Sequence, residues 1–519
     1  MNNIEHFIEI GIALSSEKDH GVLLEKIIKS AMELANADGG TIYSMSEQGE
    51  LVFETIINTT LSLHLGGTTN NEINFPPIPI LKYGVVNDSA LVAIAAHTGK
   101  IINIADVYQC PDYDLSAAKV MDKRTGYKTQ SVLTLPMKNH QGDLNGVIQL
   151  INAVNYQGEI IPFNEETEKL THALSSLAGV ILTNKQLIDE MENLFSAFSQ
   201  LIASAIDKKS PYTGGHCRRV PLITMMLAEA CHGINYGPLD KFSMSKEDFH
   251  ELGVAAWLHD CGKVATPEYV MDKAKKLETV FDRIELVSAR FEIAARDLYY
   301  SNKYDENEKA LLLKELESDR DFICHANKGG EFFDDDKIKR VHKIAKNYQV
   351  TIKGVKQDIL TSDEVYNLIT KRGTLNAKER QVINGHMDVT VEMLESMPFP
   401  KHLKRVPEYA CGHHEKMDGT GYPKGLKRDE MSIPARIMGI ADVFEALTAN
   451  DRPYKDPKTL SETLTIMGRM KLTDHLDPDL FDVFISQKVY LKFAKEYLEP
   501  SQIDLFDITE IPGCGASII

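Results

Sequence analysis

The chain has 519 residues, of which 43% are hydrophobic and 25% are charged, and its formal net charge is −18 at pH 7. This length accommodates two or three domains of ordinary size, and the composition is typical of a soluble globular protein. The strong negative charge argues against a general DNA-binding or membrane-surface protein, so a nucleotide ligand would need a local basic pocket.

The cysteine usage and the chain start indicate the compartment. Seven cysteines are scattered without a CxxC pair, which favours reduced thiols over a disulfide frame. No stretch approaches 18 apolar residues, and the opening MNNIEHFIEI lacks the basic-then-apolar order of a signal peptide. We therefore expect a cytoplasmic protein that contacts neither DNA nor a membrane.

Helix and strand signals mix over residues 1–168. The segment LLEKIIKSAMELANADGG predicts a helix that stops at Gly39 and Gly40, and GTIYSM and LVFETII predict strands. The segment SVLTLPMKNHQGDLNGVIQLINAV predicts a hairpin. This succession resembles a GAF domain, and the resemblance implies an α+β sensor domain with a small-molecule ligand of unknown identity.

Three residues in this part resemble a known signature. Asn152, Phe163 and Glu166 are similar to the NKFDE-type signature of GAF domains that bind cyclic nucleotides, although Ala153 stands at the lysine position. The alternative is that these residues are only structural.

Residues 169–206 carry apolar side chains at alternating spacings of four and three. This heptad pattern, interrupted at Asn184, predicts a long linker helix that pairs with a second copy in a parallel coiled coil, so we expect a homodimer. The alternative is a helix packed within one chain. The apolar positions are Leu170, Leu174, Leu177, Ile181, Ile188, Met191, Phe195, Phe198, Ile202 and Ala205.

Strand signals nearly vanish in residues 207–519, which predict an all-α bundle. The segments HELGVAAWLHDCGKV, ERQVINGHMDVTVEMLESM and ARIMGIADVFEALTAN have helical spacing. Residues 275–372 form a charged, mostly helical interval without a histidine–acid cluster. We predict an insertion there, whose role as a lid, a dimer contact or a partner surface stays open.

Histidines and aspartates gather at the ends or on one face of these predicted helices. Helical bundles build metal sites from such inward-facing side chains, and imidazole with carboxylate suits a catalytic site of iron, manganese or zinc. Seven ligands exceed the need of one ion and fit two ions bridged by a carboxylate. Any single histidine of the set could equally be a core or surface residue. The set is His216, His259, Asp260, His386, His413, His414 and Asp442.

The stretches HDCGK and HHEKMDGTGYPKGL resemble the HD-GYP family of bacterial phosphodiesterases, which linearise cyclic di-GMP to pGpG and often hydrolyse it onward to GMP. The resemblance covers about residues 200–275 and 372–475. It implies that all seven residues above bind metal, that Asp260 bridges the ions, and that Asp260 and Lys263 are catalytic. It also makes Gly421, Tyr422 and Pro423 the signature turn.

Candidate phosphate ligands follow the last aspartate. Arg452 and Lys455 match the phosphate-contacting positions of the family, and Lys424 and Arg436 are further candidates. The alternative is that all four are solvated surface cations.

The expected function is a metal-dependent phosphodiesterase for cyclic di-GMP, or else for 3′3′-cyclic GMP-AMP, regulated by the GAF domain. A general nucleotide phosphohydrolase and a receptor that binds a cyclic dinucleotide without cutting it are the alternatives. Family members with three ions use a glutamate four residues before the first ligand histidine. Tyr212 stands there, so we expect two ions, iron first and manganese second.

Overall fold

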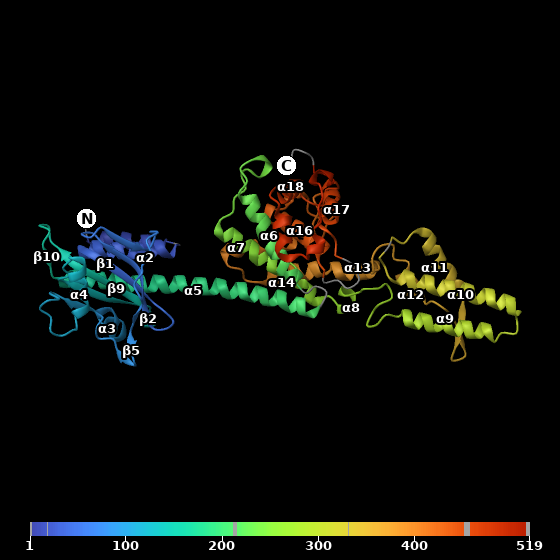
Figure 1. Cartoon of the computed structure of the whole chain (residues 1–519), viewed down its shortest axis with the longest axis horizontal. Helices are drawn as coiled ribbons and strands as arrows, with labels where there is room; N and C mark the ends of the chain where they lie inside the picture. Colours follow the sequence, from blue (N-terminus) through green and yellow to red (C-terminus); the bar gives the residue numbers. More distant parts are fainter. Residues whose placement is uncertain (1–2, 18, 211–214, 331, 451–456, 515–519) are drawn as a thin grey trace. The chain divides into compact units, whose positions relative to one another are not determined.

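The computed structural model describes residues 3–17, 19–210, 215–330, 332–450 and 457–514. The chain divides into two compact units, Met1–Leu194 and Phe195–Ile519, whose elements are labelled in Figure 1. Within the described ranges, every helix is too short or too polar to cross a lipid bilayer.

An antiparallel sheet with the order β3-β2-β1-β9-β8-β7 is the centre of the first unit, with β4 paired to β2 and β10 to β9. A separate small hairpin joins β5 (Leu81–Lys82) to β6 (Val85–Val86). The strands of the main sheet are β1 (Ala37–Met45), β2 (Glu50–Asn58), β3 (Leu63–Gly66), β4 (Ile78–Pro79), β7 (Ile102–Ile104), β8 (Val132–Lys138), β9 (Leu144–Val154) and β10 (Ile160–Ile161).

Helices cover both faces of this sheet, as Figure 1 shows. One face packs against α1 (Asn3–Ser15), α2 (His20–Ala35) and the start of α5 (Glu165–Lys209) through a shared apolar core. The other face packs against α3 (Leu91–Thr98), and α4 (Ser116–Thr125) lies beside it. The predicted α+β class is confirmed, as are the two strands and the hairpin.

The predicted stop of the first long helix was wrong. Helix α2 ends at Ala35, and Asn36 adopts φ 49° while its backbone N–H caps the last turn. Gly39 and Gly40 lie in β1 instead. A Cβ atom at Gly40 would come within 2.7 Å of Ile28 Cδ1, so glycine lets the helix pack closely on the strand.

Asn152 has a structural partner for each side-chain group. Its Oδ1 accepts the backbone N–H of Gln130 at 2.7 Å, and its Nδ2 donates to Lys128 O at 2.8 Å and Tyr127 Oη at 2.9 Å. Phe163 is buried in the apolar core beneath the sheet. These contacts support the structural interpretation of the signature-like residues.

The linker is the single 45-residue helix α5. Part of the predicted apolar seam is used inside the chain: Leu174 is buried in the core of the first unit, and Ile202 packs on the core of the second. The middle of the helix keeps an exposed apolar stripe. Its members are Leu187, Ile188, Met191, Leu194, Phe198 and Leu201.

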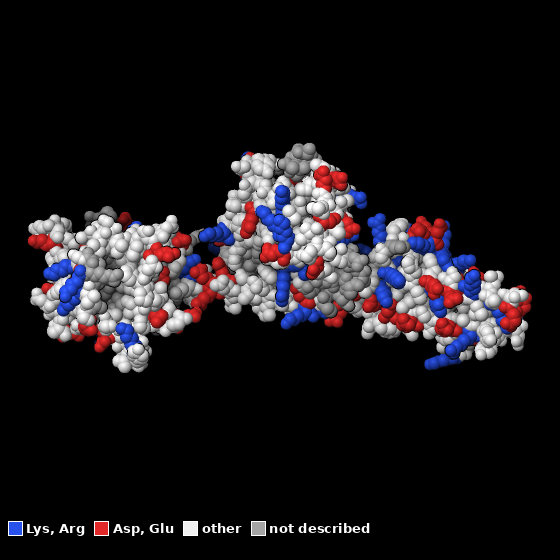
Figure 2. Space-filling model, in the orientation of Figure 1, with Lys and Arg blue, Asp and Glu red and all other residues white. Residues whose placement is uncertain are grey.

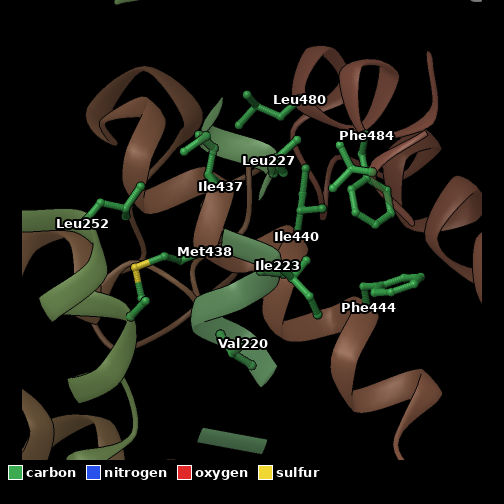
Figure 3. Close-up of a cluster of buried hydrophobic side chains, with 14 of the residues drawn as sticks. Val220, Ile223, Leu227, Leu252, Ile437, Met438, Ile440, Phe444, Leu480 and Phe484 are labelled. Carbon is green, nitrogen blue, oxygen red and sulfur yellow. The ribbon is translucent and has the colours of Figure 1, made fainter. Parts of the chain in front are cut away.

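The second unit is an α bundle, as predicted, and Figure 3 shows apolar side chains of four of its helices packed together. Short 3₁₀ turns join several helices, and η2 (Cys261–Ala265) carries part of the site described below. The helices are α6 (His216–His232), α7 (Lys246–Leu258), α8 (Glu268–Met271), α13 (Ala377–Asn384), α14 (His386–Ser396), α15 (Val406–Cys411), α16 (Ile433–Thr448), α17 (Leu460–Leu472), α18 (Pro478–Ser486) and α19 (Val489–Tyr497).

The predicted insertion is mostly helical and has its own apolar core, which includes Phe291, Ile323 and Ile344. It also forms one hairpin that the sequence did not suggest, between β11 (Gln349–Ile352) and β12 (Val355–Asp358). Basic and acidic side chains are interspersed on the face of the insertion that Figure 2 shows. The helices are α9 (Ile284–Tyr299), α10 (Glu306–Asn327), α11 (Asp335–Asn347) and α12 (Ser362–Leu368).

Candidate metal centre

The seven predicted ligands converge inside the second unit from five positions of the chain. His216 opens α6, His386 opens α14, and Asp442 lies within α16. His259 and Asp260 connect α7 to η2. The adjacent His413 and His414 follow α15, and all seven except His414 are buried.

Asp260 stands between two groups of histidines. Its Oδ2 lies 3.1 Å from His216 Nε2 and 3.3 Å from His259 Nε2. Its Oδ1 lies 3.2 Å from His386 Nε2 and 3.9 Å from His413 Nε2. One group comprises Asp260, His216 and His259, and the other comprises Asp260, His386, His413 and His414, each with ligand atoms within 4.8 Å of one another. One carboxylate thus serves two adjoining sites.

Asp442 also faces both groups. Its Oδ1 lies 3.3 Å from His216 Nε2, and its Oδ2 lies 4.0 Å from His414 Nδ1. The carboxylates of Asp260 and Asp442 therefore both reach the two groups of histidines.

Three buried polar atoms at this point lack a hydrogen-bond partner within the described ranges: Asp260 Oδ1, His386 Nε2 and His413 Nε2. The pair Asp260 Oδ1 and His386 Nε2 is close but not aligned for a hydrogen bond. Each such orphan costs about 1–3 kcal/mol unless a ligand satisfies it. A divalent cation accepts lone pairs from imidazole and carboxylate alike, so the residues fit a metal.

Backbone carbonyls orient three of the rings. The Nδ1 atoms of His259, His386 and His413 lie 2.7, 2.5 and 2.6 Å from the carbonyl oxygens of the residues three positions earlier. A donated Nδ1–H leaves the Nε2 lone pair free and directs it inward, which is the tautomer that a metal needs.

His216 is oriented by a side chain that sequence reasoning missed. Its Nδ1 contacts Glu445 Oε2, and Arg219 Nε donates to Glu445 Oε1 at 2.7 Å. Glu445 follows Asp442 by three positions and so lies on the same face of α16. That spacing was the available signal, but an acid on a helix is too common for the sequence alone to assign it a role.

Charge and burial set the protonation of the centre. Burial alone would raise the pKa of Asp260, but the charges of Lys263 and His259 and hydrogen bonds from histidine hold it well below its usual value. Burial lowers the pKa of His414 to about 4 and that of His413 well below its ordinary value. Both adjacent rings are therefore neutral at pH 7, as metal ligands must be.

Lys263 lies within the centre and donates a hydrogen bond to Asp260 Oδ2. Burial lowers its pKa, but the charge of Asp260 and this hydrogen bond outweigh burial and raise it above the ordinary value. The ammonium group is therefore a fixed positive charge beside the shared carboxylate.

Two glycines are required by close packing rather than by backbone angles. A Cβ at Gly262 would lie 2.0 Å from His386 O, and one at Gly421 would lie 2.4 Å from Lys416 N. The turn so formed places Tyr422 against His414, with ring centroids 4.8 Å apart and an interplanar angle of 29°. Pro423 follows in a cis peptide bond. The signature turn thus supports a ring of the centre.

Glu415 follows the two adjacent histidines and binds the backbone of the loop beyond them. Its carboxylate accepts the backbone N–H groups of Lys424 at 2.7 Å, Gly425 at 3.1 Å and Leu426 at 2.9 Å. It therefore holds the loop after the signature turn.

The predicted phosphate ligands have different surroundings. Lys424 lines a separate cavity of about 520 Å³ and lies 3.7 Å from Glu395. Arg436 is paired with Asp477, which also caps α18. Arg452 and Lys455 lie outside the described residues, as does Tyr212.

Comparison with known proteins assigns both parts of the chain. Residues 19–182 match the model of the GAF domain, and residues 359–480 match that of the HD domain. The chain contains a GAF domain and an HD domain. The HD match includes His386, His413, His414 and Asp442, whereas the HDCGK stretch precedes it.

Curated relatives are similar over part of the chain. A 3′3′-cGAMP-specific phosphodiesterase 1 and a probable cyclic di-GMP phosphodiesterase of Vibrio cholerae are 37% and 32% identical over 139 residues, 26% of this chain and 31% of each relative. A cyclic di-GMP phosphodiesterase of Thermotoga maritima is 38% identical over 95 residues, 18% of this chain and 25% of the relative. The chain thus spans less than a third of the length of these relatives.

Among solved structures, the GAF domain of a phosphoenolpyruvate-protein phosphotransferase from Coxiella burnetii is 18% identical, with a TM-score of 0.28. The match covers 37% of this chain and 98% of the Coxiella burnetii chain.

Proposed function

We propose that the second unit is a metal-dependent phosphodiesterase that opens a cyclic dinucleotide by cleaving a P–O bond with water. The observation that carries this proposal is the position of Asp260, whose two oxygens each face a separate group of histidine nitrogens. Two adjoining metal sites that share a carboxylate are the usual equipment for hydrolysis of phosphodiesters. The names of the relatives support the substrate class.

Two divalent ions per chain are proposed, with iron preferred and manganese as the alternative. His216 and His259 would hold one ion, and His386, His413 and His414 the other; Asp260 would bridge them, and Asp442 would complete the set. When bound, such a pair activates water and offsets charge on the leaving oxygen.

The remaining residues position and charge the centre. Lys263 supplies a fixed positive charge to the phosphate where charge develops during cleavage. Glu445 holds the ring of His216, and Tyr422 supports that of His414.

Cyclic di-GMP is the proposed substrate, with pGpG and GMP as products. The Vibrio cholerae relatives named for 3′3′-cGAMP support a second candidate of the same class. A receptor that binds without cutting is less well supported, because the side chains of all seven proposed ligands converge and Lys263 donates a hydrogen bond to Asp260 among them.

We propose three parts for the chain: a GAF sensor over residues 1–168 with an unidentified small-molecule ligand, a linker over 169–206, and an HD-GYP domain over 207–519 with a helical insertion at about 275–372. The exposed stripe on α5 supports a homodimer through the linker. All seven cysteines are free, which supports a reducing cytoplasmic location.

The activity is tested by incubating metal-loaded protein with each cyclic dinucleotide and separating the products by chromatography. We expect linear dinucleotide or mononucleotide from cyclic di-GMP, and none from Asp260→Ala. Intact substrate with fully loaded protein would refute the proposal.

The metal count is tested by elemental analysis of protein purified without oxygen, with Tyr212→Glu beside it. Two equivalents in the native protein are expected, and three would overturn the two-ion proposal. A third equivalent only in Tyr212→Glu would support the inference that this position sets the count.

A further inference from the structure

A pocket of about 540 Å³ opens where the insertion returns to the helical bundle. Phe332 and Tyr366 supply aromatic rings to its lining, and Lys371, Arg372 and Arg380 supply cations. None of the described residues that line it is an aspartate or a glutamate. In a chain of net charge −18, such a lining is a local basic pocket of the kind that a nucleotide requires.

Two of the cations have no salt-bridge partner in the part of the chain that the structure describes. Arg372 and Arg380 are exposed, and neither forms a salt bridge to any residue that the structure describes. Lys371 lies 2.9 Å from Asp335 and is therefore partly neutralised. An unpaired guanidinium group can bind a phosphate through two hydrogen bonds.

The aromatic rings are available as well. Phe332 is 58% exposed and Tyr366 is 37% exposed. The guanidinium carbon of Arg372 lies 5.5 Å from the ring centroid of Phe332, so a cation and a flat apolar surface are presented together. Aromatic rings beside cations bind nucleotides by stacking on the base while the cations hold the phosphate.

The pocket adjoins the candidate metal centre. Arg380 lies on α13, and His386 begins α14 six residues later, a separation of about 9 Å along a helix. Gly385, between the two helices, has helical backbone angles of φ −62° and ψ −12°, so α13 leads almost directly into α14 and to His386.

A buried network fixes the two walls of the pocket to each other. Lys273 Nζ lies 2.7 Å from Glu379 Oε1 on α13 and donates to Asn367 Oδ1 on α12 at 3.0 Å. Asn376 Nδ2 donates to the same oxygen at 2.8 Å. The backbones of Tyr366 and Arg380, next to Asn367 and Glu379 in the sequence, are thereby held in position before any ligand binds.

We propose that this pocket binds one purine nucleotide of the cyclic dinucleotide while a phosphate of the same molecule lies at the metal centre. Tyr366 and Phe332 stack on the base, and Arg372 and Arg380 bind a phosphate oxygen. The insertion then contributes to substrate selection, because it supplies all of these residues except Arg380. This inference rests on the proposed function.

The test compares steady-state kinetics of Tyr366→Ala and Arg380→Ala with the unaltered metal-loaded protein, with cyclic di-GMP as substrate. Each variant should raise KM by about tenfold or more, with a smaller change in kcat and an unchanged metal content. Lys356→Ala, an exposed lysine on β12 of the same insertion, is the matched control and should leave KM unchanged.

An unchanged KM in both variants would overturn the inference, as would an equal rise in KM for Lys356→Ala. Direct binding of GMP to metal-free protein, measured by calorimetry, should weaken in Arg380→Ala; equal affinity would also overturn it. Failure of the proposed function differs from these results, because the unaltered protein would then hydrolyse no cyclic dinucleotide while still cleaving bis(4-nitrophenyl) phosphate.

Discussion

Asp260 and Lys263 lie three residues apart, yet they should contribute differently to catalysis. Asp260→Ala removes the carboxylate shared by both groups of histidines, so we expect loss of bound metal and of turnover. Lys263→Ala should retain metal and lower kcat by about 10²–10³-fold, because a fixed charge aimed at the reacting phosphate is lost. Elemental analysis and kinetics on the same samples separate the two effects, and near-normal kcat in Lys263→Ala would show that the lysine has no catalytic role.

Glu445 gives the second prediction at this scale. Glu445→Gln retains the shape of the side chain but removes the charge that holds His216 and Arg219. Loss of such a partner weakens metal binding by about 10–100-fold. Competition with a chelator measures this affinity without reference to activity.

The control for Glu445 is Glu415→Gln, because Glu415 binds loop backbone instead of a ligand ring. If both variants bind metal equally well, the contact between Glu445 and His216 has no part in positioning the ligand.

Single residues also show where sequence reasoning stops. The seven proposed ligands were predicted from histidine and aspartate positions and from family motifs, and the structure brings their side chains together. Glu445 and Arg219 were missed because their role depends on which helices meet. Gly262 is required only because α14 approaches its backbone, and this contact is encoded nowhere near it in the sequence.

At the scale of elements, α5 offers an apolar stripe without a cover in the described part of the chain. Leu194, which is 70% exposed, lies at the middle of the stripe, and Ile188 lies at its edge. Leu194→Asp or Ile188→Asp should weaken a dimer formed through this helix, because each buries a charge in the seam. Light scattering over a range of protein concentrations measures the molar mass of the particle in solution and so the fraction of dimer.

Gln200→Asp is the matched control, since Gln200 is exposed on the opposite side of α5. A monomer before any substitution, or an equal effect of Gln200→Asp, would contradict the coiled-coil interpretation.

The insertion contains a buried lysine that makes its stability depend on pH. Lys276 is 1% exposed, donates to Leu368 O at 2.9 Å, and lies 3.9 Å from the ring centroid of Phe333. Burial lowers its pKa from 10.5 to about 8. Between these values the unfolded chain binds a proton that the folded chain does not, so stability rises with pH across this window.

The free energy of unfolding of the insertion should rise by about 2–3 kcal/mol across this pH window, and this rise should be absent from Lys276→Met. Hydrogen exchange of peptides from α10 and α12, corrected for the chemical exchange rate at each pH, measures it. Lys343→Met, at an exposed position of α11, should keep the rise. The same slope in Lys276→Met would exclude Lys276 as its source.

The local sequence pattern predicted which helices and strands exist more reliably than it predicted where they end and what they pack against. Period-two alternation was sufficient for β1, β2 and the β8–β9 hairpin, whereas the stop of α2 depended on Asn36 and the packing of Gly40. The heptad pattern gave α5 as one helix. It did not reveal that Leu174 packs into the first unit, because an apolar seam looks the same whichever surface covers it.

At the scale of the whole molecule, the division into two compact units predicts that metal stabilises only one of them. All proposed ligands lie in the second unit, and so does the single tryptophan, Trp257. Trp257 packs against the core of that unit. Its fluorescence should therefore follow unfolding of the metal-binding unit alone, while circular dichroism follows both. Two thermal transitions are the expected result.

Free metal at about 100 times its Kd stabilises the folded state by about 2.7 kcal/mol, which corresponds to about 4 °C for a unit of this size. A chelator should therefore lower the midpoint temperature of the transition seen by tryptophan fluorescence by that amount. The midpoint temperature of the other unit should stay unchanged. In Asp260→Ala the chelator should shift neither transition. If both transitions move together in the native protein, the two units unfold as one, and a signal from the GAF domain could then reach the metal centre through stability as well as through α5.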